Sequence, residues 1–194
     1  MEIRLATPDD IEDIRALMRK YHINSILDED KPDGFVTTNM SALQMESLIS
    51  RERGITIAGE NGSLAAFAMA GSWGFWSEWP LFEHMIGILP EYSFDGQALT
   101  TENTYQYGPI CVDKSWRGKG VFESVFAYSL RSMRERYPIM LTFINQINGR
   151  SYAAHTRKAR MSTIGAFAFN QNNYYLLACL TDNERERATK GTAL

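Results

Sequence analysis

The sequence has few of the side chains that metal sites, disulfides and thiol nucleophiles require. Its 194 residues include two cysteines and three histidines. Cys111 and Cys179 each lie in an apolar, strand-like run and form no CxxC pair, and His22, His84 and His155 lack the spacing of zinc ligands. We therefore expect two small buried thiols and no bound metal.

Long apolar runs and an excess of positive charge are also missing. No stretch reaches the ~18 consecutive apolar residues of a membrane-spanning helix, and the N-terminal "MEIRLATPDD" is acidic where a signal peptide has its apolar core. Lys and Arg number 20 against 23 Asp and Glu, a net charge of −3, which disfavours a nucleic-acid partner. We expect a cytoplasmic protein with neither a membrane nor a nucleic-acid partner.

What remains is sufficient for one sizeable core, since 44% of the residues are hydrophobic. Residues 2–6 predict a first strand, and Thr7 predicts the N-cap of a helix. A second helix is expected over 41–52 with Leu43 facing inward. The turn signal Asn61-Gly62 between two apolar runs predicts a hairpin.

The segment 73–103 is irregular and unusually aromatic, and two interpretations are open. It could form the pocket for an acceptor molecule, because aromatic walls suit an apolar or aromatic amine or a cation held over a ring. It could instead be a satellite core or a contact between two copies of the chain, as in a homodimer. The aromatic residues are Trp73, Phe75, Trp76, Trp79, Phe82, Tyr92 and Phe94.

The second half of the chain predicts alternating strands and helices. A strand over 104–112 precedes a helix from Val121, a buried strand over 138–146, a helical segment from Asn148, and a hairpin over 164–180 that turns at "NQNN". The order β-α-α-β-β-insertion-β-α-β-α-β-β indicates an α/β layer architecture. We expect one domain over residues 1–180, followed by a polar, frayed tail over 181–194.

The stretch "ICVDKSWRGKGVFESVF" carries the main functional signal. A helix begins directly after two glycines, and its free backbone N–H groups with the nearby Arg and Lys suit a pyrophosphate. A plain loop-to-helix turn, which also uses glycine for steric reasons, is the alternative. A Walker A loop and a Rossmann fingerprint are excluded by spacing. The candidate anion-binding residues are Arg117, Gly118, Lys119, Gly120, Val121 and Phe122.

This stretch resembles motif A of the GNAT superfamily of acyl-CoA-dependent N-acetyltransferases, and "NQINGRSYAAHTRKARM" resembles the segment after that family's fifth strand. The resemblance implies a GNAT-like, mostly antiparallel sheet with helices on both faces. It also implies acetyl-CoA as co-substrate and direct acetyl transfer to a primary amine of a small molecule or protein. Backbone groups of Ile110, Cys111 and Val112 would lie along the pantetheine arm, with Asn148 and Ser151 as further contacts. Helix capping is the alternative role of Asn148 and Ser151.

Two departures from the family pattern bear on chemistry. Phe122 stands where Gly or Ala is usual, so its ring must turn away from the pyrophosphate or crowd it. His155 stands where many relatives have a Tyr that protonates the leaving thiolate, and it is our candidate general acid, with a structural histidine as the alternative. These departures also favour a second function, a CoA-binding sensor or interaction domain without catalysis.

The general base is less well defined by sequence. Glu102, Tyr105 and Tyr107 near the start of the strand over 104–112 are candidates, as are Glu83 and Glu91 in the aromatic segment. We favour Glu102, and an ordinary surface or packing role is the alternative for each of them. The basic cluster Arg150, Arg157, Lys158 and Arg160 has three interpretations: a site for the 3′-phosphate of CoA, a solvated surface, or a contact for an acidic partner.

Overall fold

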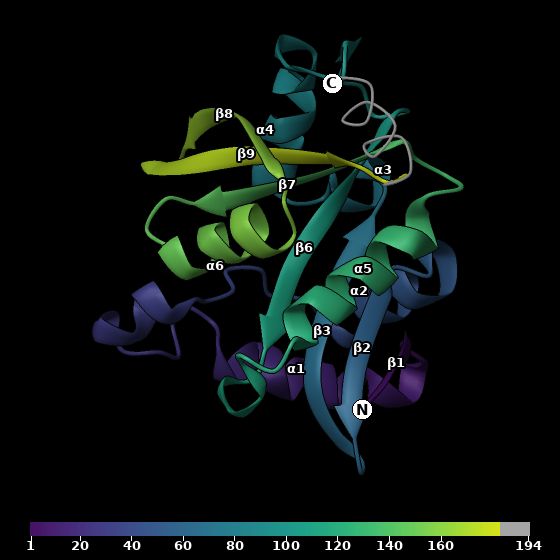
Figure 1. Ribbon diagram of the computed structural model, residues 1–194, viewed down its shortest axis with the longest axis vertical. Coiled ribbons are helices and arrows are strands. Elements are labelled where there is room, and N and C mark those ends of the chain that lie inside the picture. Colours follow the sequence, from purple (N-terminus) through teal and green to yellow (C-terminus); the bar gives the residue numbers. More distant parts are fainter. Residues whose placement is uncertain (183–194) are drawn as a thin grey trace, which may run out of the picture.

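A seven-stranded sheet of order β1-β2-β3-β6-β7-β9-β8 runs through the computed structural model, which describes residues 1–182 (Figure 1). Neighbouring strands are antiparallel except β6 and β7, which are parallel. The predicted mixed, mostly antiparallel architecture is confirmed. The strands are β1 (Glu2–Leu5), β2 (Ile55–Glu60), β3 (Ser63–Gly71), β6 (Thr104–Val112), β7 (Ile139–Asn145), β8 (Ser162–Phe169) and β9 (Asn172–Leu180), with a separate hairpin of β4 (Ser93–Phe94) and β5 (Gln97–Ala98).

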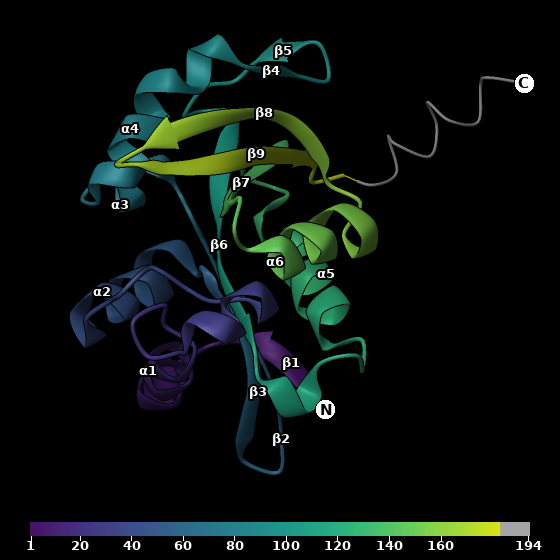
Figure 2. The same cartoon turned by 90° about the vertical axis from the view of Figure 1, so that its left-hand side faces the viewer.

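Helices cover both faces of this sheet (Figure 2). One face carries α1 (Ile11–Lys20), α2 (Ala42–Ser47), α3 (Trp73–Trp76) and α4 (Pro80–Ile88). The other carries α5 (Val121–Met133) and α6 (Gly149–Ala153), which continues as a π-helical turn over Ala154–Lys158. Each layer buries its own apolar cluster against the sheet, so the sheet is covered on both sides, as the sequence predicted.

Local signals explain most of these elements. Asn61 and Gly62 have left-handed φ angles of 52° and 77° and turn β2 into β3, while Asn170 and Gln171 at 46° and 62° turn β8 into β9. Two left-handed residues in succession are typical of tight hairpin turns. Both predicted hairpins are therefore confirmed, with the turns where the sequence placed them.

The predicted helix over 41–52 is confirmed, but one of its expected inward-facing residues needs a correction. Ser41 caps α2 by accepting a hydrogen bond from Gln44 N at 3.2 Å, and α2 continues beyond Ser47 as a π-helical turn over Leu48–Glu52. This start directs Met45 and Leu48, three residues apart, to the core. Leu43, which we expected to face inward, is 77% exposed.

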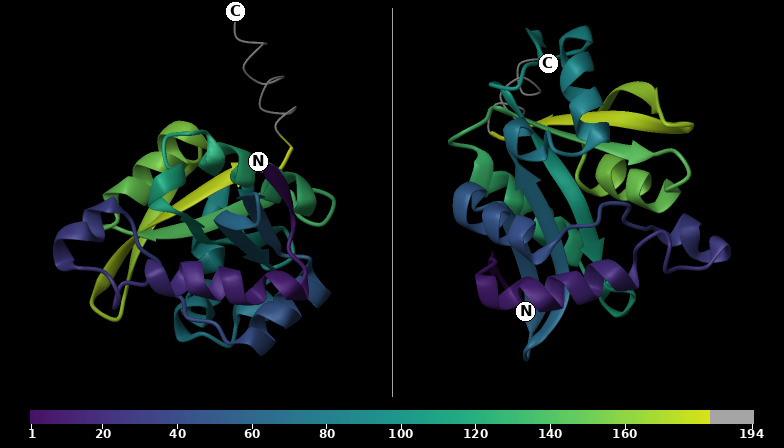
Figure 3. Two further views of the ribbon diagram at one scale, coloured as in Figure 1. Left: turned by 90° about the horizontal axis from the view of Figure 1, so that it is seen from below. Right: turned by 180° about the vertical axis from the view of Figure 1, so that it is seen from behind.

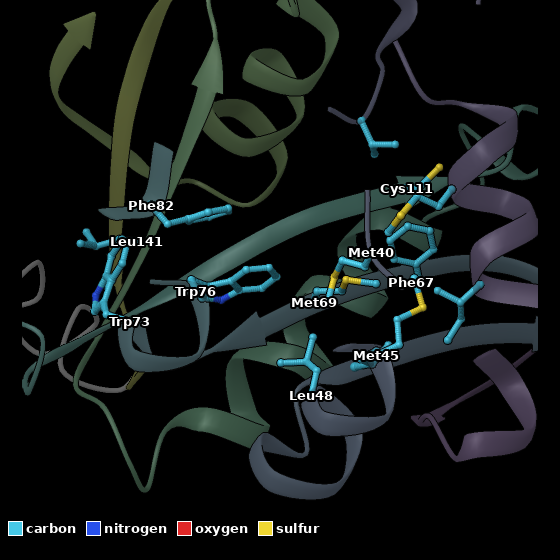
Figure 4. Close-up of a cluster of buried hydrophobic side chains, with 14 of the residues drawn as sticks. Met40, Met45, Leu48, Phe67, Met69, Trp73, Trp76, Phe82, Cys111 and Leu141 are labelled. Atoms are coloured by element: carbon cyan, nitrogen blue, oxygen red, sulfur yellow. The ribbon is translucent and has the colours of Figure 1, made fainter. Parts of the chain in front are cut away.

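The aromatic insertion is part of the core. Trp73, Trp76 and Phe82 are buried (Figure 4), with Trp76 and Phe82 stacked at 4.8 Å between ring centroids. Trp73 Nε1 donates to Thr104 Oγ1 at 2.8 Å and so anchors α3 to the start of β6. The satellite-core interpretation therefore holds for the tryptophans, whose side chains pack inside the chain and line neither of the cavities described below.

The end of the described chain is held in place. Thr181 N donates to Pro138 O at 2.9 Å, and its hydroxyl donates to Tyr137 O at 2.7 Å. The rest of the predicted polar tail, residues 183–194, lies outside the described residues. Within residues 1–182, no helix has both the length and the apolar character needed to cross a membrane.

The start of α1 depends on one carboxylate. Asp10 accepts hydrogen bonds from Thr7 N at 2.7 Å and from both terminal nitrogens of Arg4 at 2.7 and 2.8 Å. The Arg4 guanidinium, with help from Thr7, lowers the pKa of Asp10 to about 2. The bond pair joins β1 to the first turn of the helix, which explains the acidic residue at this position.

We predict that Asp10→Asn lowers the free energy of unfolding near neutral pH by about 1 kcal/mol, a value reduced because Arg4 is partly exposed to screening solvent. A depressed folded-state pKa stabilises above the unfolded value, so the difference between wild type and variant should vanish as pH falls from about 4 to about 2. Urea unfolding across this range measures it, with Asp9→Asn at the same helix start as the control. A difference that persists at the acid end would contradict the assignment.

Candidate active site

The site lies where β6 separates from β7. The two strands pair over only three rungs, from Thr104 with Ile139 to Gln106 with Leu141. Beyond Gln106, β6 follows β3 with a register shift, whereas β7 stays paired with β9 as far as Asn145. The opening between the strands exposes backbone that would otherwise be used in the ladder, and two adjoining cavities lie along it.

The first cavity has a volume of about 320 Å³. Its walls are the segment 33–36, the end of β6, the loop before α5, and α6 with its π-helical turn. Of the residues predicted for the cofactor or catalysis, it contains Ile110, Cys111, Val112, Arg117, Gly118, Gly120, Val121, Phe122, Asn148, Ser151 and His155. It does not contain Lys119 or Glu102. Residues far apart in sequence are thus brought to one cavity as the motifs predicted.

The loop before α5 has the geometry of an anion cradle. Gly118 and Gly120 have left-handed φ angles of 77° and 79°, and a Cβ built on either would meet no atom within 4 Å. The helix begins at Val121, and its first intrahelical bond is donated by Ser124 N to Gly120 O. The preceding N–H groups therefore have no intrahelical acceptor and lie at the positive end of the helix dipole, beside the open space at the two glycines.

The side chains of the two basic residues in this loop contact other parts of the protein. Arg117 donates from Nε to Val112 O at 3.0 Å and from a terminal nitrogen to Asp33 O at 2.9 Å, with its guanidinium 5.0 Å from the centre of the Tyr21 ring. The Lys119 ammonium lies 4.9 Å from the centre of the Trp116 ring. Arg117 thus fixes the end of β6 to the segment after α1, and its side chain is committed to protein carbonyls.

Most of the positive charge of the first cavity comes instead from α6 and its π-helical turn. Four basic side chains (Arg117, Arg150, Arg157 and Lys158) line the cavity against two acidic ones (Asp33 and Glu123), a net of +2 in a chain whose net charge is −3. Lys158 pairs with Glu123 at 2.9 Å, and Arg150 lies 3.8 Å from Asp33. This local excess favours an anionic ligand.

Asn148 acts as a cap and as a tether. Its Oδ1 accepts from Ser151 N at 3.2 Å, and its Nδ2 donates to Phe35 O at 3.1 Å. The segment between α1 and α2 is thereby held across the sheet against α6 (Figure 3). The capping alternative is observed, and a contact of Asn148 or Ser151 with pantetheine stays a prediction. No motif marks the segment 33–36, so this wall of the cavity was not among the residues expected at the site.

His155 is a neutral hydrogen-bond acceptor in this geometry. Its side chain is 2% exposed, and its Nδ1 lies 2.7 Å from Ser151 O. A carbonyl only accepts, so Nδ1 carries the proton and Nε2 carries a lone pair, for which no partner is present among the described residues. Burial lowers the pKa of the imidazole to about 4. The expected general acid therefore does not fit, because Nε2 has no proton to give at neutral pH.

Phe122 packs between neighbours of the same wall. Its ring centroid lies 5.1 Å from that of His155 and 6.1 Å from that of Phe126. The ring is thus directed toward α6 and also forms part of the first cavity. A Gly or Ala here would leave the His155 ring without this contact.

Glu102 is placed away from both cavities. It is exposed in the turn before β6 and accepts a hydrogen bond from the Thr101 hydroxyl at 2.7 Å. Six residues separate it from Gly108 at the strand opening, roughly 20 Å along an extended chain. The structure does not bring Glu102 to the site, and the surface-carboxylate alternative describes what is seen.

A second cavity of about 80 Å³ adjoins the first. Both are lined by Phe35, Val36, Ile110, Asn148, Ser151 and His155. Further walls come from α4 and β7, including Phe82 and Phe143. Two adjoining spaces along the strand opening suit two reactants that meet where the spaces share walls.

No protein-family model matches the sequence, and no curated protein matches it significantly. Solved structures do match. An N-acetyltransferase from Staphylococcus aureus Mu50 has a TM-score of 0.63 and 19% identity over 93% of this chain and 98% of its own. YncA of Salmonella typhimurium, solved with its cofactor acetyl-CoA, has a TM-score of 0.60 and 15% identity over 93% and 94% of the two chains.

A ribosomal-protein-alanine N-acetyltransferase from Brucella melitensis gives a TM-score of 0.61 and 16% identity over 93% and 99% of the two chains. At identities this low, the comparisons show a shared fold and do not show a shared substrate or mechanism. This chain therefore has the fold of the GNAT N-acetyltransferases.

Proposed function

We propose that the chain transfers an acetyl group from acetyl-CoA directly to a primary amine. The observation that carries this proposal is the first cavity, which runs from the glycine cradle of Gly118 and Gly120 to the opening of β6 and β7 and is positively charged. One structural neighbour was solved with acetyl-CoA, and another is an alanine N-acetyltransferase of a ribosomal protein. Both agree with acetyl transfer by this fold.

The residues that would hold the co-substrate follow from the geometry. The N–H groups at the start of α5 would bind the diphosphate, and Arg150 and Arg157 in the cavity wall would meet further negative charge. Backbone groups of Ile110 to Val112 would bind the extended arm. Acetyl-CoA supplies an acyl thioester, which is activated toward amines.

The protein would hold the two reactants in position, exclude water from them and surround them with polar groups. The amine nitrogen forms a bond to the acetyl carbon, the carbon–sulfur bond breaks, the thiolate leaves, and the proton lost by nitrogen passes to the thiolate or water. A backbone N–H in the opened part of β6 can stabilise the negative charge that develops on oxygen. Bringing the two reactants together removes the need for a covalent acyl-enzyme.

A second candidate function is CoA binding without catalysis. The observation that favours it is the neutral His155, whose Nε2 has no proton to donate, in a site that Glu102 does not reach. The release of free thiol from acetyl-CoA with a broad panel of amines separates the two functions. Turnover with any amine supports transfer, and tight binding without turnover on the whole panel supports the non-catalytic domain.

We predict that Gly120→Ala weakens acetyl-CoA binding about tenfold, because the new Cβ would occupy the open space at the cradle. Calorimetric titration with acetyl-CoA measures this. The matched control is Gly62→Ala, which has a similar φ of 77° and equally open surroundings but lies in the β2–β3 turn. Both variants should lose about 1 kcal/mol of stability through left-handed strain, and only Gly120→Ala should lose affinity. Equal affinity in both variants would exclude the cradle.

We also predict that His155 contributes no ionisation to catalysis near neutral pH. The imidazole has a pKa of about 4 because it is buried, so it stays neutral at the pH where a general acid would act. The pH profiles of kcat for wild type and His155→Phe should therefore have the same shape between about pH 6 and 8, with any loss in the variant appearing as a uniform decrease. A limb in the wild-type profile that the variant lacks would restore the general-acid role.

A further inference from the structure

The second cavity carries no charged wall. Among residues 1–182, none of those that line it is Asp, Glu, Lys or Arg, and its titratable side chains are His155 and Tyr174. Burial lowers the pKa of His155 and raises that of Tyr174, so both are uncharged near neutral pH. An alkylammonium ion entering this space would lose hydration without gaining a counter-charge, which is strongly unfavourable.

Two side chains that line this cavity each carry a buried hydrogen-bond acceptor without a donor. Gln106 is 2% exposed, and its Nε2 donates to Tyr107 O at 2.6 Å, which fixes the orientation of the amide. Its Oε1 is buried without a partner among the described residues, as is Nε2 of His155. Buried acceptors in this state are costly unless a ligand supplies N–H or O–H groups.

These acceptors are positioned by the strand opening. An ideal Cβ on Gly108 would lie 3.5 Å from Thr142 Oγ1 and 3.7 Å from Gln106 Nε2, so the three residues meet at one wall. His155 lies on the boundary that both cavities share. A donor group placed between these walls would thus be next to the end of the first cavity.

Aromatic and aliphatic side chains form one part of the remaining wall. Phe82 and Phe143 have ring centroids 5.2 Å apart, and Phe143 packs edge-on against Tyr174 at 5.7 Å. All three line the second cavity together with Ile110 and Pro109. Such walls suit an aromatic ring, and the small volume suits a single ring rather than a long chain.

We infer that the second cavity takes a weakly basic aromatic amine that binds uncharged, with its N–H groups donated to Gln106 Oε1 or His155 Nε2. This inference rests on the proposed function, since it names the acceptor class for that transfer. A neutral amine has its lone pair free for the acetyl carbon while its N–H bonds are held. The amine nitrogen bonds to the acetyl carbon, the carbon–sulfur bond breaks, and the proton lost by nitrogen passes to the thiolate or water.

The test compares three amines of similar size on the full chain loaded with CoA: aniline, benzylamine and cyclohexylamine. Aniline is aromatic and weakly basic, benzylamine is aromatic but cationic near neutral pH, and cyclohexylamine is cationic and not aromatic. Ligand-observed NMR titrations at neutral pH measure binding without requiring turnover. We expect aniline to bind at least about tenfold more tightly than either cation.

A charge-introducing variant sharpens the comparison. Gln106→Glu puts a carboxylate of nearly the same shape into the cavity and should narrow or reverse the preference, raising the affinity for benzylamine relative to aniline. The control is Gln97→Glu, which adds the same charge on the exposed β4–β5 hairpin and should leave the order unchanged. If Gln106→Glu fails to fold, the order of affinity of the three amines for the wild-type chain still tests the inference.

The inference is overturned if benzylamine or cyclohexylamine binds as tightly as aniline, or if none of the three binds. Its failure is distinguishable from that of the proposed function. Acetyl-CoA binding together with thiol release in the presence of strongly basic amines would support acetyl transfer and contradict the aromatic acceptor. Absence of acetyl-CoA binding would instead contradict the proposed transfer itself.

Discussion

The short parallel pairing of β6 with β7 is the constraint on which the site depends. A full parallel ladder would close the sheet and consume the backbone groups of both strands, but these strands share only three rungs and then diverge. The divergence is maintained from both sides, because β6 remains bound to β3 and β7 remains bound to β9. Two halves of one sheet thus hold a gap open between them. The cavities, the exposed strand backbone and the buried Gln106 all follow from this arrangement.

A second layer of organisation joins the segment after α1 to the rest of the site. Arg117 donates to Asp33 O and Val112 O, Asn148 donates to Phe35 O, and Tyr21 OH accepts from Lys114 N at 2.7 Å. These bonds connect four parts of the chain that are distant in sequence. Since each is made by a buried or half-buried group, losing a partner would leave a polar atom unsatisfied. The segment 33–36 is therefore held in place as a wall of both cavities by hydrogen bonds from Arg117 and Asn148. These bonds couple its position to α6 and to the end of β6.

Sequence patterns predicted the fold well and the site only in part, for physical reasons. Periodicity, capping residues and the Asn61-Gly62 turn are local, and they specified the element order and the glycine cradle before α5. The direction of a charged side chain depends on residues that are distant in sequence. Arg117 was expected at the anion, but it donates to two carbonyls instead. Burial is not local either, so the core position of Trp73 and Trp76 and the neutral state of His155 could not be obtained from spacing. The unpaired acceptor on Gln106 had no signal in the sequence at all.

The neutral character of the junction bears on how a proton could be handled there. A thiol has an ordinary pKa of about 8.5, so a thiolate can leave near neutral pH without an acid beside it. The lack of a proton on His155 Nε2 therefore matters less for the proposed transfer than the position of a base. In the described part of the chain, Asp33 and Glu123 line the first cavity, whereas no carboxylate lines the second. An alkylamine, whose pKa is about 10, would arrive almost entirely protonated and would need such a base. A weakly basic amine arrives already neutral. In the proposed transfer, the uncharged walls of the second cavity and the unpaired acceptors on Gln106 and His155 would act together, because a weakly basic acceptor would need no catalytic carboxylate beside it.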